Sequence, residues 1–154
     1  FHDKSEPLKY QIMKQADFYI LSKEDEASRQ LFACRISEKV YKMEKSIHIS
    51  SPDKGYSESL SKLLWSYKEE SFLPHEIETK ETQKDPKCIL ITHNKKTTNK
   101  SDVLINLSEI EIDECSKFER IVEIVLNQEG SKKKARERFV EFRNLGYKVK
   151  SHQM

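Results

Sequence analysis

Two short runs of almost uninterrupted apolar residues, at 88–92 and 102–107, place the strongest constraint on the fold. Strands that are covered on both faces show such runs, whereas strands with one wet face alternate apolar and polar residues. Both runs are therefore predicted to be central strands of a parallel sheet. Further strands are predicted at 16–21, 46–50 and 121–126, with a last edge strand at 147–150.

Helical patterns separate these strands. Apolar residues recur at helical spacing over residues 25–44, 56–68 and 130–145. Polar loops are predicted at 76–87 and 94–101, and an acidic, irregular segment at 108–118. Strands that alternate with helices indicate one α/β domain with a mainly parallel sheet and helices on both faces.

The last predicted helix combines an apolar face with a row of cations. Ser131 is a candidate N-cap, and Gly146 occupies the position after the helix end that favours glycine. A turn of about 100° per residue gathers the core side, which comprises Ala135, Phe139, Phe142 and Gly146. The same projection aligns three cations along one flank of that face: Lys132, Arg136 and Arg143. Four residues point into water: Lys133, Glu137, Glu141 and Asn144. Such a helix is suited to an anionic and apolar ligand, although an ordinary amphipathic helix has the same pattern.

The helix at 56–68 directs its tryptophan away from the core. Its core side is predicted to consist of Tyr56, Leu60, Leu63, Leu64 and Tyr67. Trp65 then lies about 140° from the centre of that side. Either another protein covers this ring, with Phe72 extending the patch, or a neighbouring loop of the chain does.

Charge and cysteine content limit the partners and the compartment. The net charge of the 154 residues is only +2, but residues 129–154 carry eight Lys or Arg against three Asp or Glu, whereas the rest sums to −3. An acidic partner is therefore expected at the C-terminal end.

The three cysteines are widely spaced, which favours a reducing compartment over disulfides or a zinc site. Without an apolar run long enough to span a bilayer, a soluble cytoplasmic protein with no membrane partner is expected.

No motif of known chemistry stands out. None of the three glycines belongs to a phosphate-binding loop, and no two histidines have the spacing of a helical metal site. His93 follows a strand end, where such sheets often place catalytic residues, but a loop or capping role is favoured. Direct nucleic-acid binding by residues 132–134 is disfavoured, because no aromatic residues are interleaved with the lysines. We expect no metal and no cofactor.

Several segments in a fixed order resemble the chi subunits of bacterial DNA polymerase III. The segments are Phe18-Tyr-Ile-Leu21, Leu64-Trp65, Ser71-Phe-Leu-Pro-His75, Asp102-Val-Leu-Ile-Asn-Leu107 and Ala135-Arg-Glu-Arg-Phe139 through Gly146. The likeness covers residues 13–154. Residues 1–12 lie outside it and are expected to be an N-terminal extension or an expression remnant.

The resemblance implies a single Rossmann-like, three-layer domain that is not an enzyme by itself. It implies a subunit that pairs with the psi subunit and binds the acidic C-terminal tail of single-stranded-DNA-binding protein, so that DNA is contacted indirectly. The family's tail-binding positions correspond to Val125, Lys132, Arg136, Phe139, Arg143 and Ser151. Its psi-facing positions correspond to Trp65 and Phe72. A lysine usual in the family is replaced by Val140, and a tyrosine by Phe139. The alternative from another class is a nucleotide-dependent enzyme on the same fold.

Overall fold

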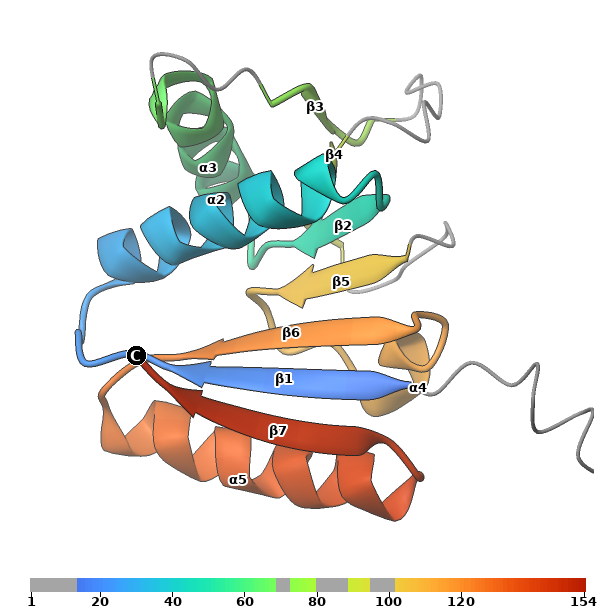
Figure 1. The fold of residues 1–154 in the computed structure, drawn as a ribbon. Helices are drawn as coiled ribbons and strands as arrows, with labels where there is room; N and C mark the ends of the chain where they lie inside the picture. The colour runs from blue at the N-terminus through green and yellow to red at the C-terminus, as the bar shows by residue number, and fades with distance from the viewer. Residues whose placement is uncertain (1–13, 69–72, 80–88, 95–101) are drawn as a thin grey trace, which may run out of the picture.

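Every strand runs parallel to its neighbours in a computed structural model of the chain, as Figure 1 shows. The structure describes residues 14–68, 73–79, 89–94 and 102–154. The strands are β1 (Gln15–Ile20), β2 (Ile47–Ser50), β3 (His75–Ile77), β4 (Ile89–Thr92), β5 (Val103–Asn106), β6 (Arg120–Val125) and β7 (Lys148–Gln153). The helices are α2 (Glu26–Lys42), α3 (Lys54–Ser66), α4 (Ile112–Cys115) and α5 (Glu129–Asn144).

The seven strands form one sheet in the order β3-β4-β2-β5-β6-β1-β7. Helices α2 and α3 lie on one face of the sheet and α5 on the other, which gives three layers (Figure 1). Side chains along β6 alternate between the two cores: Val122 and Ile124 pack with α2 and α3, whereas Ile121 and Val125 pack with α5. The predicted fold class is thus confirmed, and the described sheet is wholly parallel.

The ends of the helices follow capping chemistry. Asp25 and Asp53 accept hydrogen bonds from backbone N–H groups in the first turns of α2 and α3. Helix α5 begins earlier than predicted, with Gln128 as its N-cap, so the prediction of Ser131 as N-cap is wrong. Its other end is as predicted: Gly146 has a φ of 91°, a conformation that glycine adopts at little cost.

Three segments differ from the sequence prediction. The loop predicted from residue 76 begins as the short edge strand β3, and the segment predicted to be irregular contains the single helical turn α4. Both are too short for a periodic pattern to show. Strand β7 extends to Gln153, three residues beyond the predicted end, because its polar last residues pair with β1. Residues 1–12, Phe72 and Cys88 lie outside the described residues.

The two described cysteines, Cys34 and Cys115, are free and buried. Burial raises the pKa of each thiol to about 12. Both thiols are therefore protonated and unreactive at neutral pH.

Candidate functional site

A groove of about 560 Å³ runs between α5 and the sheet edge formed by β1 and β7. It is lined by Phe18, Ile20, Val125, Lys132, Ala135, Arg136, Phe139, Val140, Ser151 and Gln153. Apolar side chains dominate this lining, and the cations belong to α5. We refer to it as the α5–β7 groove.

Strand register explains why residues far apart in sequence share the floor of this groove. Phe18 on β1 is opposite Ser151 on β7, and Ile20 is opposite both Gln153 on β7 and Val125 on β6. Residues in register on parallel strands point to the same face of the sheet. Phe139 of α5 closes one end of the floor by packing on Phe18, with 5.5 Å between the ring centroids.

The six cations of α5 differ in their partners. On one side of the helix, Lys134 pairs with Glu109, and Arg138 pairs with Glu123. On the groove side, Lys132, Arg136 and Arg143 form no ion pair with any of the described residues. Lys133, on the exposed side of α5, also forms no ion pair with the described residues, but the two cations that line the groove, Lys132 and Arg136, are both available to a ligand.

The structure brings five of the six predicted tail-binding residues together in the lining of the groove: Val125, Lys132, Arg136, Phe139 and Ser151. Arg143 is exposed on the same flank of α5, about 10 Å farther along the axis from Arg136, and does not line the groove. Val140 does line it and is 43% exposed.

The lining also contains residues that the sequence analysis did not select as site residues: Phe18, Ile20, Ala135 and Gln153. The period of two along β1 was the available signal for Phe18 and Ile20, since it puts both on one face. No sequence pattern pointed to Gln153, because it lies in a polar segment and its position in the groove follows from the pairing of β7 with β1.

An apolar floor with cations at its rim can hold a ligand that ends in an apolar side chain and carries negative charge. Phe139 and Val125 supply apolar surface, and the planar guanidinium of Arg136 can donate two parallel hydrogen bonds to a carboxylate. Lys132 adds a point charge on the same flank.

On the opposite face of the sheet, a buried carboxylate ties β1 to both of its neighbours. Asp17, which is 1% exposed, accepts hydrogen bonds from Gln15, from Arg120 Nε at 2.9 Å and from His152 Nε2 at 2.9 Å. Burial alone would raise the pKa of Asp17, but the hydrogen bonds from His152, Gln15 and Arg120 outweigh it and lower that pKa. The side chain of His152 also stacks on Tyr19, with ring centroids 4.6 Å apart.

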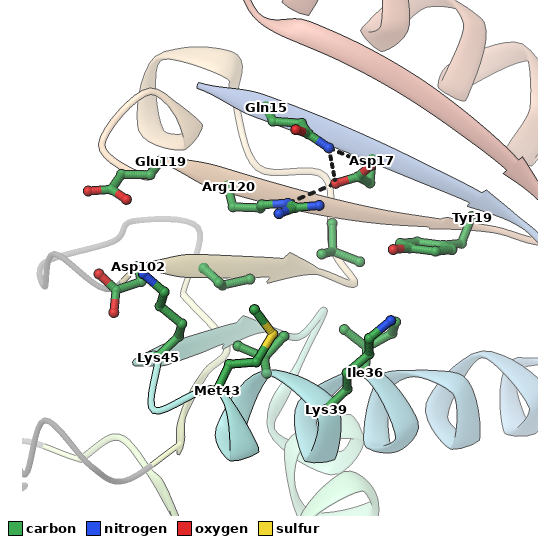
Figure 2. A pocket seen from close by; sticks show the side chains of 13 residues that line it. Gln15, Asp17, Tyr19, Ile36, Lys39, Met43, Lys45, Asp102, Glu119 and Arg120 are labelled. Atoms are coloured by element: carbon green, nitrogen blue, oxygen red, sulfur yellow. Dashed lines mark hydrogen bonds and ion pairs between the residues drawn. The ribbon is translucent and has the colours of Figure 1, made fainter. Parts of the chain in front are cut away.

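Figure 2 shows the bonds of Asp17 to Gln15 and Arg120 in a cavity of about 400 Å³ between the sheet and α2. Cations and carboxylates balance in the lining of this cavity: three are cationic (Lys39, Lys45 and Arg120) and three acidic (Asp17, Asp102 and Glu119). Asp17 and Asp102 are already held by groups of the chain itself. We therefore interpret the hydrogen bonds of Asp17 as structural. The bond from His152 holds β7 against β1, and the other face of β7 forms one side of the α5–β7 groove.

We predict that Asp17→Asn lowers the free energy of unfolding at pH 7 by about 1.5–2 kcal/mol, the lower part of the range for hydrogen bonds to a charged group. Because folding lowers the pKa of Asp17 from its ordinary 3.8, the carboxylate stabilises the fold fully above that value and loses its contribution as the pH falls below it. Urea unfolding at pH 7 and pH 3 should therefore show a difference between wild type and variant that shrinks at pH 3. An equal difference at both pH values would contradict this prediction.

A cavity of about 510 Å³ lies at the carboxyl ends of β5 and β6, where sheets of this kind often bind ligands, and the charged groups in its lining pair with each other. Arg138 donates two hydrogen bonds to Glu123, at 2.9 and 3.0 Å, and one to the Ile110 carbonyl at 2.7 Å. Asn106 Nδ2 donates to Glu123 at 2.8 Å. Burial opposes the charge of Arg138, but the adjacent Glu123 carboxylate outweighs it and raises the pKa of that guanidinium.

A separate aromatic surface lies on α3. The predicted core side of this helix is confirmed, since Leu60 and Leu64 are fully buried and the other three residues pack on the same core. Trp65 is 54% exposed, as its position in the helical projection predicted. Its predicted companion Phe72 lies outside the described residues.

No group of three or more His, Cys, Asp or Glu side chains among the described residues is arranged to hold a metal ion. None of their helices is both long and apolar enough to cross a membrane.

Comparison with known proteins gives one consistent result. The family model described as DNA polymerase III chi subunit, HolC, matches residues 13–150. The chain is 26% identical over 142 residues to the DNA polymerase III subunit chi of Pseudomonas aeruginosa, which covers 92% of this chain and 98% of that protein. The proteins of the same name in Escherichia coli and Haemophilus influenzae are 27% and 25% identical, over 89% and 90% of this chain and 96% of each relative.

Proposed function

The chain belongs to the DNA polymerase III chi subunit family, and on that premise we propose that it is a non-catalytic accessory subunit with two docking surfaces. The α5–β7 groove binds the acidic C-terminal tail of single-stranded-DNA-binding protein. The exposed side of α3 at Trp65 binds the psi subunit, with Phe72 as a second contact that the family resemblance implies. The chain thereby links the clamp loader to coated single-stranded DNA, which it contacts only indirectly.

The observation that carries the tail-binding proposal is the pairing pattern of α5. Lys134 and Arg138 pair with acids of the chain, whereas Lys132 and Arg136, which line the apolar floor, form no ion pair within the part of the chain that the structure describes. Arg136 would receive the terminal carboxylate, and the apolar last side chain would rest between Phe139 and Val125. Lys132, Arg143 and the exposed hydroxyl of Ser151 would meet the remaining acidic or polar groups. Val140 provides no cation in this chain, so the long-range attraction of the acidic tail depends on Lys132 and Arg143.

Titration of a labelled tail peptide into the purified chain at two salt concentrations tests the proposal. Binding should weaken as salt rises, because exposed charges are screened. A peptide that lacks its apolar terminal residue should lose most of its affinity. Binding that ignores both salt and the terminal residue would place the site elsewhere.

For the second surface, we predict that Trp65→Ala and Phe72→Ala each weaken binding to the psi subunit while leaving the fold intact. A half-exposed tryptophan is a typical interface anchor, and truncation of such an anchor costs about 2 kcal/mol. The measurement is calorimetry with purified psi, with circular dichroism and thermal melting as fold controls. Unchanged affinity in both variants would refute the psi-facing surface.

We also predict that the purified chain neither binds nor hydrolyses nucleoside triphosphates, in contrast to the alternative of a nucleotide-dependent enzyme. The Glu123 carboxylate lies at the strand ends where phosphates would approach, and Arg138 is already engaged by it. Calorimetry with adenine and guanine nucleotides and a phosphate-release assay check this prediction. Turnover that survives extensive purification would favour the enzyme.

A further inference from the structure

The sole tryptophan of the chain packs on a histidine that is fixed at both of its ring nitrogens. The rings of Trp65 and His75 have centroids 4.8 Å apart and are tilted by 54°, a geometry typical of attractive aromatic pairs. His75 is 8% exposed and begins the edge strand β3, whereas Trp65 is 54% exposed on α3. The half-exposed ring therefore has a buried ring as its support.

Hydrogen bonds set the orientation of this support. The Leu73 carbonyl can only accept, so His75 Nδ1 carries a proton and donates to it at 2.8 Å. In the neutral ring, Nε2 then accepts from the hydroxyl of Ser61 at 2.9 Å. Ser61 lies four residues before Trp65 on α3, which puts both side chains on the same side of the helix, one turn apart.

We infer that Ser61 and His75 are positioning residues, which hold the Trp65 indole in the orientation that the docking partner meets. This inference rests on the proposed psi-binding surface and adds to it a reason for its affinity. An interface side chain loses rotamer freedom on binding, and a ring that is already held in place loses less. The hydroxyl of Ser61 acts on the partner only through the imidazole and the indole.

The single tryptophan makes the test specific, because its fluorescence reports on position 65 alone. We expect Ser61→Ala to lower the time-resolved fluorescence anisotropy of the indole in the isolated chain and to weaken psi binding by about threefold to tenfold. Ser61→Thr keeps the hydroxyl and should restore both values. His75→Phe keeps an aromatic ring without the two hydrogen bonds and should resemble Ser61→Ala.

Two results would overturn the positioning role. One is an unchanged indole anisotropy in both Ser61→Ala and His75→Phe with native circular dichroism and melting temperature. The other is a lower indole anisotropy in Ser61→Ala with unchanged affinity for psi, provided that the Trp65→Ala variant does bind psi more weakly than wild type. Failure of the psi-binding proposal itself looks different: Trp65→Ala would then bind psi like wild type, and the anisotropy of Ser61→Ala would still decide whether Ser61 and His75 hold the ring.

Discussion

Arg138→Ala is expected to destabilise the chain by about 3–5 kcal/mol, the cost of removing one partner from a buried ion pair. The Glu123 carboxylate is largely buried and, among the described residues, would keep only the Asn106 amide as a side-chain donor. The Ile110 carbonyl would lose a donor as well. Urea denaturation at pH 7 measures this loss as a lower midpoint with an unchanged slope.

Lys134→Ala is the matched control, since Lys134 lies one turn earlier on α5 and also pairs with an acid of the chain, Glu109. Both members of that pair are mostly exposed, so its removal should cost no more than about 1 kcal/mol. Replacing Glu123 and Arg138 together by leucine should cost less than the sum of the single alanine changes, because neither charge is then left alone. Equal losses from Arg138→Ala and Lys134→Ala would contradict this account.

The same helix shows how far the sequence alone could predict the site. The helical period put Phe139 and Phe142 on the core side and aligned Lys132 with Arg136, and the structure confirms both placements. Periodicity put Arg136 and Arg138 on different flanks of the apolar face, but it could not show which of the two arginines pairs with an acid of the chain. That distinction depends on Glu123, which strand β6 brings beneath the helix from 15 residues earlier.

The sheet was predictable where apolar residues form it and not where polar residues do. The central strands follow from the apolar runs, whereas the end of β7 consists of Ser151, His152 and Gln153. Those residues are strand because they pair with β1 and because His152 bonds to the buried Asp17. A long-range hydrogen bond of this kind leaves no local sequence pattern. Neither the length of β7 nor its contribution to the lining of the groove could therefore be predicted from the sequence.

Arg136→Ala is expected to weaken binding of the acidic tail peptide by about 1.5–3 kcal/mol, or roughly 10- to 150-fold, the scale of a hydrogen bond to a charged group. Arg136 lines the groove, and its guanidinium forms no ion pair with any described residue, so no internal acid must be displaced when a carboxylate arrives. Arg136→Lys should recover only part of the loss, because an ammonium group cannot donate two parallel hydrogen bonds to one carboxylate. Fluorescence titration of the labelled peptide measures each value at low and at high salt.

Lys133→Ala provides the control for net charge, since it removes one positive charge from the exposed side of the same helix. Lys133→Ala should weaken binding of the tail peptide by a few-fold at most, and that effect should vanish at high salt, where long-range attraction is screened. The loss in Arg136→Ala should persist at high salt, because a hydrogen bond at the groove is a short-range contact. If the two variants lose affinity equally and both effects disappear with salt, Arg136 contributes only its charge and another group binds the terminal carboxylate.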